Sequence, residues 1–136
     1  MRAVEEFLKK DRFAAHNGIE LLAVAEGYAK ARMPIQEHHL NSVDVVHGSA
    51  IFALADLAFT AASHSHETVA VGINASISYV QPATKGTLFA EAKEVSLGPE
   101  LASYAIEITN QSNEIVAAFE GVVYRSKQAI GRPVSH

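Results

Sequence analysis

The carboxyl group of Asp56 is the side chain best placed for chemistry in this chain of 136 residues. It is the only formal charge between Asp44 and Glu67, and it lies in the middle of an apolar stretch. Burying an unpaired carboxylate is costly, and a fully buried carboxyl group becomes neutral instead. Asp56 must therefore face a polar cleft, pair with another group or stay protonated. The sequence leaves open whether it is a catalytic carboxylate or a structural acid that reaches solvent or a subunit contact.

The pair His47-Gly48 is a second candidate, and it stands just before the apolar stretch. If a helix begins near Gly48, the first backbone N–H groups lack partners and the helix dipole favours negative charge. Glycine also lets a ligand come close to that backbone. An oxyanion site, which stabilises the oxygen of a carbonyl under attack, requires these features. The alternative is an ordinary helix start that is capped by Ser49 or His47.

The segment from Gly48 to about His64 is predicted to be the helix that carries these groups. Its apolar residues cover nearly every direction of a helical wheel, which is typical of a helix buried on most sides. They are Ile51, Phe52, Leu54, Ala55, Leu57, Ala58 and Phe59. Such a helix is about 24 Å long. Strands of about eight to ten residues run about 26–33 Å, so a sheet made of them can enclose the helix.

The rest of the chain shows the pattern of one short helix and six strands. A helix is expected near residues 3–15. Pro34 indicates that the second strand is an exposed edge. We expect an α+β fold, in which a curved, mostly antiparallel sheet of about five to six strands wraps one long central helix. The strands are expected near residues 18–25, 28–35, 69–80, 87–96, 101–109 and 115–125, with an irregular loop over residues 36–47.

Composition excludes several classes of protein. Apolar residues make up 49% and charged residues 19%, which excludes a disordered chain. The absence of cysteine excludes disulfides and thiolate nucleophiles, and the net charge of −4 gives no general attraction for nucleic acid. We expect one domain over residues 1–125 and a loose C-terminal tail over residues 126–136. Residues 1–10 do not look like a secretory signal, and no stretch suits a membrane span, so a cytoplasmic protein is expected.

Three spaced elements together resemble a known family. Asn41, the pair His47-Gly48 and Asp56 are similar to the signature of hotdog-fold acyl-CoA thioesterases of the phenylacetyl-CoA thioesterase (PaaI-like) family. The stretch from His47 to Asp56 resembles the family's His-Gly-Gly helix followed by Leu-Ala-Asp. The stretch from Ile77 to Ala83 resembles its next strand and proline-containing turn. The resemblance covers residues 13 to about 125. It implies hydrolysis of an acyl-CoA, such as phenylacetyl-CoA or hydroxyphenylacetyl-CoA, to a free acid and CoA.

The resemblance also implies a role for each matching residue. Asp56 would be a general base that activates water or a nucleophile that forms an anhydride. The N–H group of Gly48 would polarise the thioester carbonyl, Asn41 would orient the water or the substrate, and His47 would hold Asn41. Gly48 of one subunit would face Asp56 of another at a dimer interface, and pairs of dimers would form a homotetramer. The CoA thioester is the substrate, and no cofactor is implied.

Several further residues are candidates for contacts with the substrate. Ser49 stands where the family has a second glycine, and its side chain is expected to narrow the pocket or hydrogen bond within it. The family's polar contact early on the next strand corresponds to Gly72 or Ile73. Aromatic residues in such elements are also typical of the core. The full set is Ser49, Phe52, Thr60, Gly72, Ile73, Asn74 and Tyr79.

Two other functions stay open at this point. A hotdog acyl-thioester hydratase or dehydratase needs a paired acid and base, and His47 is the only nearby histidine for that role. A non-catalytic acyl-CoA-binding module on the same fold is the other alternative, although the intact Asp56 argues against a dead site. The pairs His38-His39 and His64-Ser65-His66 lack a further ligand at fixed spacing, so no metal site is expected.

Overall fold

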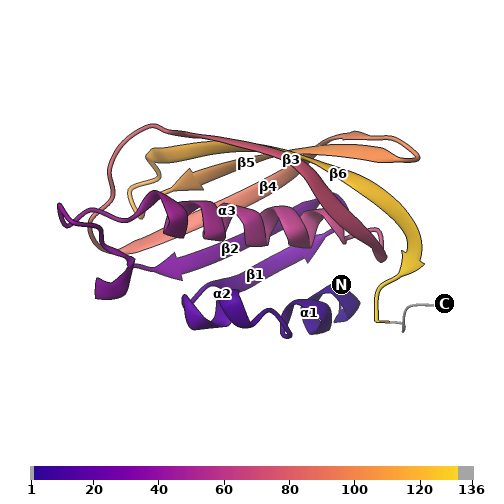
Figure 1. Cartoon of the computed structure of the whole chain (residues 1–136), viewed down its shortest axis with the longest axis horizontal. Coiled ribbons are helices and arrows are strands. Elements are labelled where there is room, and N and C mark those ends of the chain that lie inside the picture. The colour runs from indigo at the N-terminus through magenta and orange to yellow at the C-terminus, as the bar shows by residue number, and fades with distance from the viewer. Residues whose placement is uncertain (1, 132–136) are drawn as a thin grey trace.

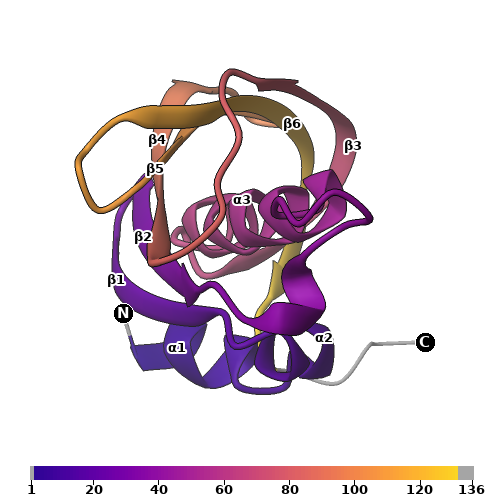
Figure 2. The same ribbon diagram turned by 90° about the vertical axis from the view of Figure 1, so that its left-hand side faces the viewer.

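A six-stranded antiparallel sheet curves around one long helix in the computed structural model, which describes residues 2–131 (Figure 1). The strand order in the sheet is β1-β2-β4-β5-β6-β3. Viewed nearly along the central helix, the sheet encloses it on three sides, and two short N-terminal helices lie below it (Figure 2). The strands are β1 (Glu20–Ala25), β2 (Tyr28–Pro34), β3 (Thr68–Tyr79), β4 (Thr87–Leu97), β5 (Leu101–Thr109) and β6 (Ile115–Ala129). The predicted α+β architecture is therefore confirmed.

The central helix is α3 (Gly48–Ser63), and it begins at the predicted residue. Most of its side chains are buried against the concave face of the sheet, as the apolar pattern predicted. The ring of Phe59 is the centre of this contact, since its centroid lies 5.6 Å from that of Phe119 and 5.9 Å from that of Tyr104. Gly121 of β6 makes room for that ring, because a Cβ atom there would lie 2.6 Å from Phe59. The helix and the sheet therefore pack closely at Phe59.

The predicted helix over residues 3–15 is two helices, α1 (Arg2–Leu8) and α2 (Arg12–His16). The second begins afresh because Asp11 is an N-cap, with its Oδ1 accepting the N–H of Ala14 at 2.9 Å. The prediction that β2 is an exposed edge is wrong, since β2 pairs with both β1 and β4. Pro34 is tolerated because it is the last residue of β2, where the ladder ends.

The C-terminal tail was predicted to begin at residue 126, which is too early because β6 continues to Ala129. Thr68 at the start of β3 pairs with Ala129, and the N–H of Ile130 donates to the carbonyl of Glu67. The strand is longer than expected because β3 offers it partners over its whole length. The remainder of the predicted tail, residues 132–136, lies outside the described residues. The loop over residues 36–47 contains one short 3-10 helix, η1 (Glu37–His39).

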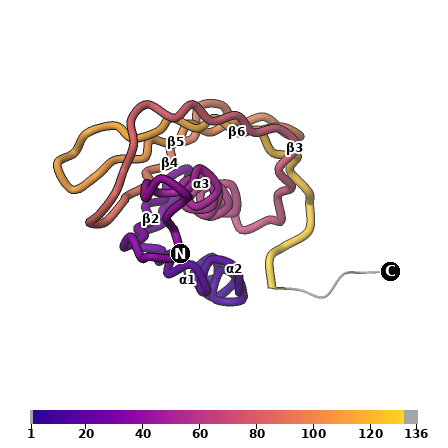
Figure 3. The backbone as a smooth tube through the Cα atoms, turned by 60° about the vertical axis from the view of Figure 1, so that its left-hand side comes forward, coloured from indigo at the N-terminus to yellow at the C-terminus, as the bar shows by residue number. Residues whose placement is uncertain are grey.

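Strand β3 forms one margin of the sheet and pairs with β6 alone (Figure 3). Most of its residues are exposed, including the large apolar side chains of Val71 and Ile73. In a globular domain an exposed, apolar edge strand marks a surface for pairing with another chain. Among the described helices, none is long and apolar enough to cross a membrane.

Candidate active site

The backbone N–H of Gly48 lies at the N-terminus of α3 and has no hydrogen-bond partner within residues 2–131. The next N–H group, of Ser49, donates to Nδ1 of His47 at 3.0 Å. The N–H groups of Ala50 and Ile51 both donate to the carbonyl of His47. Gly48 therefore supplies the free donor of the first turn. It lies beside a shallow cavity of about 350 Å³ formed with the turn that follows β3.

Tyr79, at the end of β3, covers the start of the same helix. Its hydroxyl group donates to the carbonyl of Gly48 at 3.0 Å. A Cβ atom at position 48 would lie 3.0 Å from the Tyr79 ring, which is tighter than ordinary van der Waals contact. Glycine at this position therefore allows the close approach of Tyr79, and the two predicted site residues lie together.

Asn41 and His47 have different partners from those expected. The Oδ1 atom of Asn41 accepts the N–H groups of Val43 at 3.0 Å and of Val45 at 3.2 Å. The His47 ring is instead the cap of α3, and no hydrogen bond joins it to Asn41 in the described part of the chain. The short polar side chain of Asn41 readily bonds to backbone groups close in sequence, and His47 bonds to the free N–H of Ser49 at the helix start. Asn41 orders the loop before α3, and its Nδ2 group has no partner among residues 2–131.

Asp56 lies on the face of α3 that the sheet leaves uncovered. Ser49, Ala53 and Thr60 lie on the same face at helical spacing, and each is exposed or half-buried. The Asp56 residue is exposed in the single chain, so the protein removes only part of its hydration. This partial desolvation, followed by the charge of Asp11, raises the pKa of Asp56 above its usual value. A carboxylate with a raised pKa is a better proton acceptor.

Gly48 and Asp56 stand apart within one chain. Eight residues of helix separate them, which corresponds to a rise of about 12 Å. A donor to the carbonyl oxygen and a base that activates the attacking water must both lie close to one thioester carbon. The two groups of a single chain therefore cannot act on the same thioester.

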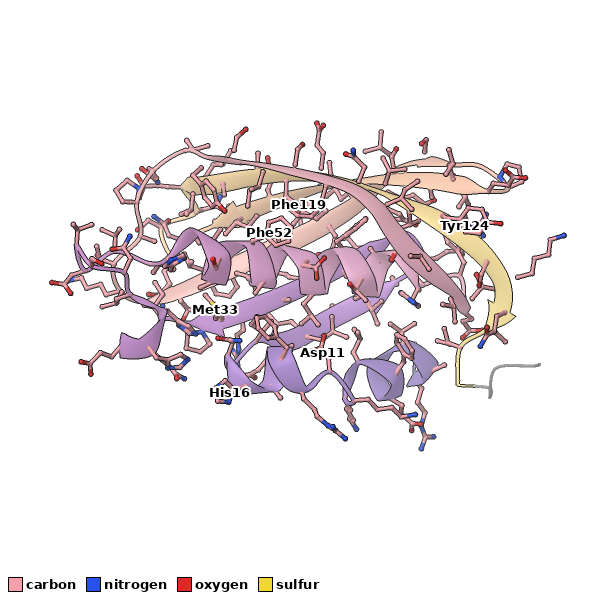
Figure 4. All side chains as sticks on the ribbon, viewed as in Figure 1. Asp11, His16, Met33, Phe52, Phe119 and Tyr124 are labelled. Carbon is pink, nitrogen blue, oxygen red and sulfur yellow. The ribbon has the colours of Figure 1, made fainter. Side chains whose placement is uncertain are left out.

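Of the other predicted contacts, Phe52 and Gly72 pack against rings of the core, whereas Ile73 and Asn74 lie elsewhere on β3. The ring of Phe52 packs edge-on against Phe119, with centroids 5.2 Å apart, so it belongs largely to the core (Figure 4). Gly72 faces the ring of Phe59, at 3.4 Å for an added Cβ atom. Ile73 is exposed on β3, and Asn74 lines a separate cavity of about 210 Å³. Of the predicted β3 contacts, the single chain therefore brings Tyr79 to the Gly48 site, but not Gly72, Ile73 or Asn74.

Two functional candidates are missing from the sequence prediction. Asp11 lies between α3 and the N-terminal helices in the view of Figure 4, and its charge acts on Asp56. The pattern of an N-cap, an aspartate at the start of an alanine-rich helix, was available in the sequence. His39 is buried and joins three segments near Gly48, which no local pattern indicates.

Two further histidines, His64 and His66, have structural partners. His64 is buried, with Nδ1 2.8 Å from the carbonyl oxygen of Thr60 and Nε2 accepting the N–H of Ala70 at 3.3 Å. The Nε2 atom of His66 lies 2.7 Å from a carboxylate oxygen of Glu94. Within residues 2–131, no group of three or more histidine, cysteine, aspartate or glutamate residues is arranged to hold a metal ion.

A family model described as the thioesterase superfamily matches residues 44–117, which is more than half of the chain and includes both Gly48 and Asp56. The chain belongs to the thioesterase superfamily. Over 118 residues, this thioesterase is 35% identical to acyl-coenzyme A thioesterase PaaI of Escherichia coli, covering 86% of this chain and 84% of that protein. It is 43% identical over 125 residues to an Archaeoglobus fulgidus protein whose name assigns it only provisionally to the esterases, covering 91% of this chain and 81% of that protein.

The solved structure of E. coli PaaI, a protein from the phenylacetic acid degradation operon, matches this thioesterase with a TM-score of 0.91. The two share 32% sequence identity, and the match covers 94% of each chain. These findings confirm the predicted PaaI-like hotdog fold and the class of enzyme, a thioester hydrolase.

Proposed function

We propose that this thioesterase hydrolyses an aromatic acyl-CoA, such as phenylacetyl-CoA or hydroxyphenylacetyl-CoA, to the free acid and CoA. The observation that carries the proposed hydrolysis is the unpartnered N–H of Gly48 at the N-terminus of α3, where the helix dipole adds to a free donor. One relative supports the substrate class. It is named an acyl-coenzyme A thioesterase, and its solved structure is described as coming from the phenylacetic acid degradation operon.

The proposed chemistry uses two groups. The Asp56 carboxylate removes a proton from water, and the oxygen of that water adds to the thioester carbon. The carbonyl oxygen gains the electron pair and is stabilised by the N–H of Gly48. When the tetrahedral intermediate collapses, the carbon–sulfur bond breaks and CoA leaves as a thiolate, which takes up a proton. In the alternative route, Asp56 attacks the carbon itself, the carbon–sulfur bond breaks and CoA leaves as a thiolate that takes up a proton. Water then hydrolyses the resulting anhydride and frees the acid and Asp56.

The proposed site is shared between two copies of the chain. The separation of about 12 Å along α3 supports a site in which the N–H of Gly48 and the carboxylate of Asp56 come from different subunits. The exposed, apolar edge of β3 is a surface on which a second copy can pair. We propose a dimer on this basis, with two dimers in a homotetramer. A cytoplasmic location also stays a prediction.

In this arrangement the free Nδ2 group of Asn41 donates to the attacking water or to the substrate. The loop around Asn41 is held by its own Oδ1 atom, so the amide is fixed in direction. Ser49 and Thr60 share the uncovered face of α3 with Asp56, and we propose that this face contacts the acyl group.

The test is thiol release from a panel of acyl-CoAs, measured on the wild type, Asp56→Asn and a control. The panel holds phenylacetyl, hydroxyphenylacetyl, benzoyl, and short- and long-chain acyl groups. Glu67→Gln is the control, because it removes an exposed carboxylate just beyond the end of α3. We expect the aromatic substrates to be the best, Asp56→Asn to lose about 10²–10⁴-fold in kcat, and Glu67→Gln to match the wild type.

Three results would contradict parts of the proposal. Equal turnover by Asp56→Asn and the wild type would remove Asp56 from catalysis. Preference for aliphatic acyl groups would remove the aromatic assignment and leave the thioesterase. Addition of water to an enoyl-CoA without thiol release would favour a hydratase instead.

A further inference from the structure

His39 is a buried histidine, only 2% exposed, that lies next to the proposed oxyanion site. Its Nδ1 atom accepts the backbone N–H of Gln36 at 3.0 Å, and its Nε2 atom lies 3.0 Å from the carbonyl oxygen of Asn17. A backbone N–H can only donate and a carbonyl can only accept, so Nδ1 is unprotonated and Nε2 carries the proton. Burial lowers the pKa of His39 below its usual value, which favours this neutral form.

The main chain of His39 is connected to the start of α3. Its carbonyl oxygen accepts the N–H of His47 at 2.7 Å, one of the shortest backbone hydrogen bonds in the loop. His47 is the N-cap of α3, and its carbonyl group forms the peptide unit that contains the N–H of Gly48. The direction of the Gly48 N–H is therefore set by the orientation of His47.

Three segments meet at His39, two of them at its side chain and the third at its main-chain carbonyl. Asn17 is the C-cap of α2, Gln36 precedes η1, and His47 ends the loop before α3. A single bridge between Leu40 and Val46 also closes the base of that loop. His39 supplies the connection from this loop to α2.

We propose that His39 is a positioning residue for the oxyanion site, holding α2, η1 and the N-cap of α3 together so that the Gly48 N–H keeps its direction. The inference rests on the proposed function, because it assigns His39 a role only if the Gly48 N–H binds the thioester oxygen. A displacement of about 1 Å at a catalytic group can cost about 10²-fold in rate. The loss of His39 should therefore lower kcat and leave KM nearly unchanged.

The test compares His39→Phe with a matched control, His64→Phe. Both substitutions keep a ring in a buried site and remove two hydrogen bonds from that ring to backbone groups. His64 lies at the opposite end of α3, more than 20 Å from Gly48 by the rise of about 1.5 Å per residue. The control therefore reproduces the loss of stability without touching the N-cap.

We expect His39→Phe to lose about 10- to 100-fold in kcat per folded molecule, well below its melting temperature, with KM within about twofold of the wild type. The kcat of His64→Phe should match the wild type even if its melting temperature falls equally. In the ¹H–¹⁵N spectrum, the amide signal of Gly48 should move in His39→Phe and stay in place in His64→Phe. A kcat for His39→Phe equal to that of His64→Phe, with the Gly48 signal unmoved, would overturn the inference.

A further pair of variants covers the case in which His39→Phe does not fold. His39→Gln can still donate to Asn17, and His39→Asn can still accept from Gln36, so each retains one of the two hydrogen bonds. Both should give a kcat between that of the wild type and about one hundredth of it. If both equal the wild type, His39 is not a positioning residue. Failure of the proposed function looks different, because the wild type itself would then release no thiol.

Discussion

Replacing Gly48 by proline removes a single hydrogen atom from the proposed oxyanion site while keeping the helix. Proline has no N–H group, and the first position of a helix tolerates it best because that N–H has no partner in the helix. The N-cap residue His47 has φ −60° and ψ 137°, within the extended region that a residue before proline requires. The N–H of Gly48 bonds to nothing else in residues 2–131, so no structural hydrogen bond is lost.

The expected loss follows from that one donor. Removing one donor from an oxyanion site costs about 10²–10³-fold in kcat, or about 2.7–4 kcal/mol. Proline also introduces a Cβ atom, 3.0 Å from the Tyr79 ring, which crowds the site. Gly48→Ala introduces the same atom and keeps the N–H, so the ratio of the two variants isolates the donor. The exposed Tyr79 side chain can move to accept that atom.

The assay is thiol release from the best acyl-CoA, with kcat and KM measured for the wild type, Gly48→Ala and Gly48→Pro. Far-ultraviolet circular dichroism and melting temperature establish that all three are folded. A kcat for Gly48→Pro within about threefold of that for Gly48→Ala would refute the assignment, since a lost oxyanion donor costs at least about 10²-fold.

Three other predictions concern Asp56 and the core. Asp56→Asn should raise the melting temperature at neutral pH, because the raised pKa means that the charged carboxylate disfavours the folded state. The gain should fall as the pH is lowered and vanish below about pH 3, where the carboxyl group is protonated in both states. Asp11→Asn keeps the cap on Ala14 but removes a charge, so the pKa of Asp56 should fall. The acid limb of the pH profile of kcat/KM should then move to lower pH. An unmoved acid limb would contradict the effect of the Asp11 charge on Asp56. Gly121→Ala should lower the free energy of unfolding by about 1–3 kcal/mol, because the added Cβ atom overlaps the Phe59 ring. The measurement is unfolding in urea. An unchanged urea midpoint would show that the ring moves aside without cost.

The fold could be predicted where one local pattern dominates. The apolar residues of α3 cover almost the whole helix, and the predicted first residue of the helix, Gly48, is correct. The break between α1 and α2 depends on the Asp11 cap, and the extension of β6 to Ala129 depends on pairing with Thr68 across the sheet. Pairing between distant strands leaves no periodic signal in either strand alone. The prediction of an exposed edge from Pro34 was wrong for a related reason. A proline is also tolerated at the end of a paired strand, and the end of β2 is not visible in the sequence.

The site shows the same division between local and distant contacts. Gly48 and Asp56 could be chosen as candidates because a helix start and a lone charge in an apolar segment are visible in the sequence, and the structure confirms that Gly48 begins α3. The expected hydrogen bond between His47 and Asn41 is absent from the described residues, because each side chain bonds to backbone groups nearby instead. The burial of His39 and the approach of Asp11 to Asp56 depend on how α2 packs, which the sequence does not reveal.

The strand order also governs when the site can form during synthesis. Strand β3 leaves the ribosome directly after α3, but its partner β6 begins only at Ile115, after residues 80–114 have been made. Until then β3 has no strand beside it, and Tyr79 at its end has no fixed place over Gly48. Pairings between segments this far apart are slow to close and leave apolar strands open to aggregation. A nascent chain that stops before β6 would therefore present the aggregation-prone β3 without the partner that fixes it.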